Sequence, residues 1–162
     1  MSEKENVLWT LRQDTLISQL KEGKRRNGRK LDETRKIHIQ KEGVSENAHG
    51  IARVKLGNTD VIAGVKMDVA TPYPDSPDKG AITVGVELLA LASPDFEVGP
   101  PREAAIELSR VVDRGIRESD AIDFKSLSIV SGEKCWMVII DIYILNQDGN
   151  LFDAASIAAV SA

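Results

Sequence analysis

The chain has 162 residues and a formal net charge of −4, so any nucleic-acid binding would depend on a local basic patch. Its single cysteine excludes an intrachain disulfide. With only two histidines in addition to that cysteine, the composition argues against a zinc cluster. No apolar run approaches the length of a membrane span, and the first twenty residues are too charged for a signal peptide. These features predict a soluble cytoplasmic protein with an ordinary globular core, and neither a metal nor a cofactor is expected.

The chain opens with a helix and a basic segment. Residues 7–22 have the apolar spacing of an amphipathic helix, and Gly23 predicts its end. In residues 24–30, five of the seven residues are Lys or Arg, and Asn27-Gly28 predicts a tight turn among them. Such a segment is either a solvated loop or a contact for phosphates.

The clearest local pattern is a β-hairpin over residues 51–66. Two β-rich runs are separated by Gly57-Asn58, where glycine supplies the positive φ of a two-residue turn. This register sets Lys55 opposite Asp60, and such an opposite-charge pair supports the register.

The other predicted elements alternate with two proline loops. They are strands over residues 36–40, 81–92, 126–130 and 135–145, loops over 70–80 and 93–101, and helices over 99–119 and 152–162. In the first strand, Ile37 and Ile39 are expected to point inward. The strand over 81–92 is apolar at nearly every position, so we expect it to be covered on both faces. The last helix is small and apolar enough to be buried between layers.

The helix over residues 99–119 presents two contrasting faces. At about 100° per residue, its core face holds four apolar residues: Ala105, Leu108, Val112 and Ile116. The opposite face holds Arg110, Arg114 and Arg117, a row that matches the spacing of phosphates along a nucleic-acid backbone. Alternatively, this is a solvated charged face whose arginines pair with nearby acids: Glu103, Glu107, Asp113 and Glu118.

No catalytic site is evident from residue spacing alone. The chain has no Gly-rich phosphate loop before a lysine and serine, no nucleophile elbow and no metal-ligand pair. One set of three carboxylates suggests a metal site: Asp141, Asp148 and Asp153. Asp141 lies in the middle of a predicted strand, however, and Asp148 stands beside Gly149 in a predicted turn, so structural roles are favoured.

Seven motifs in fixed order resemble the RNase PH family: residues 26–29, 50–59, 72–77, 91–94, 99–101, 106–119 and 148–151. The resemblance covers nearly all of residues 8–162. Within the family, the sequence most resembles the non-catalytic RNase PH-type subunit of the archaeal exosome. It implies an α+β fold of the ribosomal protein S5 domain 2-like type, with a mixed or antiparallel sheet packed against helices. We assign residues 1–30 to an N-terminal helix and basic loop, and residues 31–162 to an RNase PH domain.

The sequence departs from the catalytic members of that family. They carry a Gly-Ser/Thr-Arg phosphate-binding motif after the last strand, where this chain has Gly149, Asn150, Leu151 and Phe152. Leucine and phenylalanine cannot clamp a phosphate. The family's catalytic aspartate lies further along, so this chain is expected to comprise the first half of a full-length subunit. Asn27 and Ile51 also differ from the residues usual in relatives, which are aspartate and a small residue.

The resemblance therefore implies a subunit that breaks no bond. Its implied partners are RNA, a catalytic RNase PH-type subunit in a hexameric ring of heterodimers, and RNA-binding cap subunits. Such a ring degrades RNA from its 3′ end with inorganic phosphate. We expect Arg110, Arg114 and Arg117 to bind the RNA backbone. Two alternatives remain: the chain is itself a phosphorolytic exoribonuclease, or it is a scaffold whose arginines pair with acidic residues of a neighbouring subunit.

Overall fold

The structure is a computed structural model that describes residues 13–42 and 47–162, and it divides into compact units of residues 1–35 and 36–162. In the first unit, a helix covers residues 13–21 of the described part. It ends at Gly23, whose φ of 74° lets the Lys24 N–H donate to the Gln19 carbonyl at 2.9 Å. The predicted helix is thus confirmed from residue 13 onward, and residues 7–12 lie outside the described residues.

The basic segment that follows folds back on itself as a tight turn. Lys24 and Lys30 form an antiparallel bridge. The N–H of Gly28, whose φ is 80°, donates to the Arg25 carbonyl at 2.8 Å, which confirms the turn expected from Asn-Gly. The Arg25 guanidinium donates to the Leu31 carbonyl at 2.6 Å. The Arg29 guanidinium likewise donates through Nε to Asn27 Oδ1 at 3.0 Å, so two of the basic side chains hold the turn.

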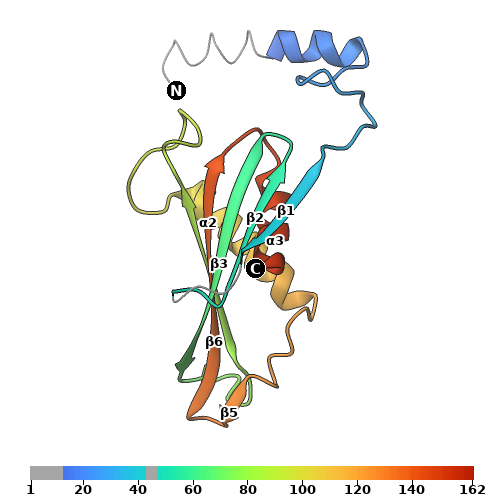
Figure 1. Cartoon of the computed structure of the whole chain (residues 1–162). Helices are drawn as coiled ribbons and strands as arrows, with labels where there is room; N and C mark the ends of the chain where they lie inside the picture. Colours follow the sequence, from blue (N-terminus) through green and yellow to red (C-terminus); the bar gives the residue numbers. More distant parts are fainter. Residues whose placement is uncertain (1–12, 43–46) are drawn as a thin grey trace. The chain divides into compact units, whose positions relative to one another are not determined.

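The second unit is a six-stranded mixed sheet with two helices on one face (Figure 1). Its strands run in the order β1-β2-β3-β6-β4, with β5 also paired to β6, and only the β4–β6 pair is parallel. The elements are β1 (Ile37–Glu42), β2 (Gly50–Leu56), β3 (Thr59–Ala70), β4 (Ala81–Leu88), α2 (Glu103–Glu118), β5 (Ser128–Val130), β6 (Lys134–Asn146) and α3 (Leu151–Ser161).

The predicted β-hairpin is formed by β2 and β3. Val54 lies opposite Val61 and Lys55 opposite Asp60, as the spacing predicted. The turn depends on Gly57, whose φ is 62°, a region that residues with a Cβ rarely adopt. The register places Val54 and Val61 on the helix-covered face, where both are fully buried.

The core lies between the sheet and the two helices. The core face of α2 was predicted correctly, since its buried residues are Ala105, Leu108, Val112 and Ile116. From α3, four alanines are buried: Ala154, Ala155, Ala158 and Ala159. Their small side chains let the helix lie close to β2 and β3. These residues pack against Ile142 and Ile144 of β6, both almost fully buried.

Two burial expectations were wrong, because both helices pack on the same face of the sheet. β4 ends at Leu88 rather than residue 92, and its Thr83 and Glu87 are exposed on the opposite face. Ile37 and Ile39 lie opposite the buried Leu56 and Val54 and so point to the helix-covered face as predicted, but they are 50% and 49% exposed because β1 is an edge strand. The helix α3 is buried on one side rather than between layers, with Val160 66% exposed. None of the helices in the described residues is long and apolar enough to cross a membrane.

Candidate nucleic-acid interface

The arginine-bearing helix α2 begins directly after the second proline loop. Pro100 and Pro101 precede an extended Arg102, with a φ of −97°, at the N-cap, and Glu103 places an acid in the first turn. The Arg102 guanidinium pairs with Glu97 of the loop at 2.6 Å. These features start the helix at a defined residue, and the i, i+4, i+7 spacing of the three arginines then places them on one face.

The three arginines of that face have different surroundings. Arg110 is exposed and makes no hydrogen bond or ion pair with any described residue. Arg114 donates through Nη2 to Glu118 Oε1 at 3.0 Å, and its side chain stays 73% exposed. Arg117 donates through Nε and Nη2 to the two carboxylate oxygens of Asp113, at 3.1 and 2.8 Å. Its side chain is only 42% exposed.

Arg117 is also tied to other parts of the domain. Its Nη2 donates to the Ile82 carbonyl of β4 at 3.4 Å, and its Cζ lies 5.8 Å from the centre of the Phe124 ring. The hydrogen bond and negative charge of Asp113 raise the pKa of Arg117, which burial opposes and Tyr73 reinforces. Arg117 is therefore anchored within the domain, whereas Arg110 and Arg114 remain open to a ligand.

Ion pairing with nearby acids, one of the two alternatives for this face, is present at two of the three arginines. Two of the four acids that were candidate partners, Asp113 and Glu118, pair with Arg117 and Arg114. Exposed i,i+4 pairs contribute only about 0.3–0.5 kcal/mol, so the pair with Glu118 holds Arg114 only weakly. RNA binding by Arg110, Arg114 and Arg117 stays a prediction.

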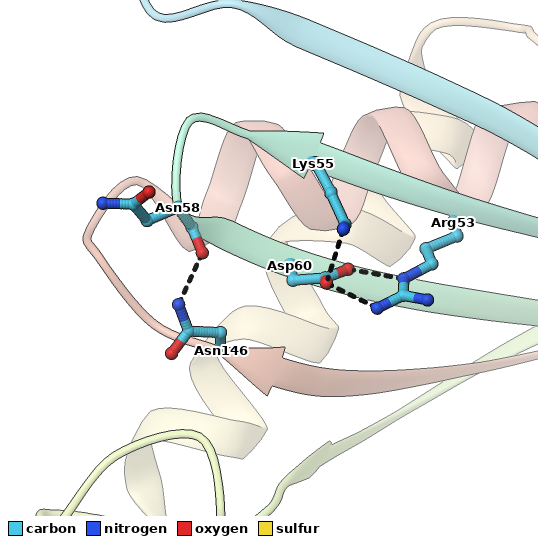
Figure 2. Close-up of polar contacts among 5 residues, drawn as sticks. All are labelled: Arg53, Lys55, Asn58, Asp60 and Asn146. Carbon is cyan, nitrogen blue, oxygen red and sulfur yellow. Dashed lines mark hydrogen bonds and ion pairs between the residues drawn. The ribbon is translucent and has the colours of Figure 1, made fainter.

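A second polar site lies around the β2–β3 turn, at the start of β3. Figure 2 shows the Asp60 carboxylate accepting hydrogen bonds from Arg53 Nε at 2.9 Å and from Arg53 Nη2 at 2.7 Å. Lys55 Nζ lies 3.8 Å from the same carboxylate. In the same view the Asn146 side-chain amide donates to the Asn58 carbonyl at 2.6 Å. The cations Arg53 and Lys55 thus both lie beside the single Asp60 carboxylate within the hairpin.

The turn before α3 is tied to this hairpin through Thr59. The buried Thr59 hydroxyl donates to the Gly149 carbonyl at 2.8 Å and accepts the Asp148 N–H at 3.0 Å. Asn58 donates through Nδ2 to the Asp148 carboxylate at 3.2 Å. A polar depression lies beside this connection, lined by Lys55, Asn58, Asp60, Asn146 and Asp148 among others.

The segment from Gly149 to Phe152, where catalytic relatives are expected to bind phosphate, lies at the start of α3. Asn150 adopts a left-handed conformation with φ 58°, and its side-chain amide donates to Asp153 Oδ2 at 2.7 Å. Phe152 is 42% exposed. The segment from Gly149 to Phe152 offers no cationic side chain, and Asp148 and Asp153 stand on either side of it.

The three aspartates considered as a metal site do not form a cluster. Asp148 accepts from Asn58 and Asp153 from Asn150, while Asp141 is exposed in the middle of β6. Within residues 13–42 and 47–162, no three His, Cys, Asp or Glu side chains are grouped closely enough to hold a metal ion.

Taken together, a mixed sheet with both helices on one face defines an α+β domain of the RNase PH type, and the exposed arginines of α2 are its candidate nucleic-acid site. Residues 33–162 match the 3′ exoribonuclease family, domain 1, and the chain belongs to this RNase PH family. The predicted fold class is confirmed by this match and by the solved structures that share the fold.

The relatives include archaeal exosome proteins. The exosome complex component Rrp42 of Methanocella arvoryzae is 52% identical over 158 residues, which cover 98% of this chain and 60% of the relative. That of Thermococcus onnurineus is 53% identical over 162 residues, covering 100% and 59%. A chain of the Archaeoglobus fulgidus exosome with RNA bound to the active site superimposes with a TM-score of 0.89 at 52% identity, covering 96% and 61%. The chain thus spans about 60% of the length of these relatives.

Sequence reasoning missed several of the contacts described above. The Arg53–Asp60 pair was within reach, because Arg53 is the diagonal neighbour of Asp60 once Lys55 is set opposite it. By contrast, Thr59 and Gly149 are 90 residues apart, and no local pattern indicated that they meet.

Proposed function

We propose that this chain is the first domain of a non-catalytic RNase PH-type subunit in a cytoplasmic, exosome-like ring that degrades RNA from the 3′ end. The observation that carries the proposal is the pair Arg110 and Arg114, exposed one turn apart on α2 and held by no buried contact. The similarity to archaeal Rrp42 proteins and to an RNA-bound exosome supports the assignment to such a complex.

The start of α3 supports a subunit without its own chemistry. Phosphorolysis needs cationic or N–H donors around the attacking phosphate. From Gly149 to Phe152 this chain offers no cation, and Asp148 and Asp153 would repel a phosphate there. Lys55 lines the nearby depression, but it already lies 3.8 Å from Asp60.

The partners follow from the resemblance and are part of the proposal. They are RNA, a catalytic RNase PH-type subunit in a hexameric ring of heterodimers, and RNA-binding cap subunits. In this arrangement the α2 face completes a groove for RNA beside the partner's active site. Arg114 exchanges Glu118 for a backbone phosphate, Arg110 binds a second phosphate, and the anchored Arg117 adds positive charge at the end of the row.

The decisive experiment substitutes Arg114 by alanine in the assembled complex with the catalytic partner. RNA affinity is expected to fall about equally for all sequences, because phosphates carry no sequence information. The slope of log affinity against log salt is expected to fall by roughly 0.7, the contribution of one contact to single-stranded RNA. Arg114→Lys restores part of the affinity, since it keeps the charge but loses the planar fork.

A matched control is available at the other end of the helix. Arg102 is 72% exposed and ion-paired, like Arg114, but it lies at the N-cap and outside the arginine row. Arg102→Ala is therefore expected to leave RNA affinity unchanged. If Arg114→Ala loosens the subunit pair while RNA affinity per intact complex stays constant, the arginines serve a scaffold and the RNA-binding proposal is wrong.

Catalysis is tested on the isolated chain. Incubated with RNA and inorganic phosphate, the purified chain is expected to release no nucleoside diphosphates, because a phosphate site is missing at the start of α3. Steady, phosphate-dependent product formation that follows this chain through purification would contradict the non-catalytic assignment. The assembled complex serves as the positive control for the assay.

A further inference from the structure

Tyr73 stands out among the aromatic side chains of the described residues. It is 54% exposed, more than Phe152, Trp136 or Tyr143 at 42%, 39% and 37%. It lies in the loop between β3 and β4, between Pro72, which is buried, and Pro74. A large aromatic ring is thus held out toward solvent by a backbone that proline restricts on both sides.

The loop that carries Tyr73 is fixed by hydrogen bonds. The Ser76 N–H donates to the Tyr73 carbonyl at 3.0 Å, which closes a turn. Farther along, the Gly80 N–H donates to the Phe124 carbonyl at 2.7 Å, which ties the loop to the segment that follows α2. The position of the Tyr73 backbone is therefore set before any ligand binds, and little ordering entropy remains to be lost.

The same segment ties the loop that carries Tyr73 to the end of the arginine row. Phe124 lies under the Arg117 guanidinium at 5.8 Å, and Arg117 Nη2 donates at 3.4 Å to the carbonyl of Ile82, two residues beyond Gly80 in β4. Figure 1 shows the β3–β4 loop and the segment after α2 at the same end of the sheet as β5. Arg114 is one turn back along α2 from Arg117, so the loop with the exposed ring is tied to the end of the helix that carries these arginines.

We propose that Tyr73 is a base-stacking residue, which binds a base of the RNA strand whose phosphates the α2 arginines hold. This inference rests on the proposed function of that site. Proteins that track single-stranded RNA combine a basic groove with aromatic rings, because every base has a π-face that stacks without sequence preference. Arg114 and Arg110 supply the basic part, and Tyr73 supplies the ring.

The test uses Tyr73→Ala and Tyr73→Phe in the complex with the catalytic partner, and short single-stranded RNA as the probe. Loss of one stacked base is expected to weaken binding by about 5- to 150-fold for Tyr73→Ala. Tyr73→Phe keeps the ring and is expected to stay within about twofold. Tyr143→Ala is the control, since Tyr143 is an exposed aromatic on the sheet face opposite the helices.

Two further measurements separate stacking from charge. Tyr73→Ala is expected to leave the salt slope unchanged, because no phosphate contact is lost, whereas Arg114→Ala lowers it. RNA with an abasic nucleotide at the stacked position is expected to bind wild type and Tyr73→Ala equally.

The outcomes distinguish this inference from the proposed function. Unchanged affinity in Tyr73→Ala, with weakened binding in Arg114→Ala, overturns the stacking role and leaves RNA binding by α2 intact. Unchanged RNA affinity in both variants overturns both. If Tyr73→Ala instead prevents assembly of the complex while Tyr73→Phe permits it, the ring contacts a protein partner and the stacking proposal is wrong.

Discussion

The outer face of α2 and the β2–β3 hairpin each hold an arginine paired with a carboxylate, but the two pairs differ in how far they are exposed to solvent. In the Arg114–Glu118 pair the side chains are 73% and 64% exposed. In the Arg53–Asp60 pair they are 37% and 13% exposed, and two guanidinium nitrogens reach the carboxylate. Water and salt screen the first pair, so little free energy is needed for a ligand to displace Glu118 from Arg114. Breaking the less exposed Arg53–Asp60 pair needs more free energy.

Arg117 stands between these extremes. Like Arg114 it pairs with an acid four residues away on the same helix, but it also bonds the β4 backbone and contacts Phe124. Exposure and the number of partners, rather than the presence of an ion pair, therefore separate arginines that stabilise the fold from those that remain open to a ligand.

The largest expected effect is at Asp60. Asp60→Ala removes the carboxylate that accepts two hydrogen bonds from the partly buried Arg53 guanidinium and that lies 3.8 Å from Lys55 Nζ. We expect the free energy of unfolding to fall by about 2 kcal/mol, less than for a fully buried pair because Arg53 is partly solvated. Urea denaturation measures this. Asp68→Ala, at an exposed position of the same strand, is the control and is expected to change stability little.

A smaller effect is expected along α2. Arg117→Ala loses the Asp113 pair, the bond to the Ile82 carbonyl and the Phe124 contact, so we expect a loss of about 1 kcal/mol in unfolding free energy. Arg114→Ala loses only one exposed pair and is expected to stay within about 0.5 kcal/mol. Thermal and urea unfolding of both variants test the order. Equal losses at the two positions would contradict the distinction between anchored and available arginines.

Local interactions made much of the fold predictable. The Gly57-Asn58 turn and the alternating side chains on either side of it were enough to set the β2–β3 register. The 3.6-residue period was enough to separate the core face of α2 from its arginine face. In both cases the determining residues are neighbours along the chain.

The amino-acid sequence by itself determined the hairpin, the two faces of α2 and the absence of a cation from Gly149 to Phe152, because each depends on residues close together in the chain. Only the tertiary structure decided that one face of β4 stays uncovered, since that depends on where both helices pack. It also distinguished Arg117 from Arg114, because the Ile82 carbonyl that Arg117 reaches is 35 residues away. Such contacts follow from the packing of whole elements, which no local pattern specifies.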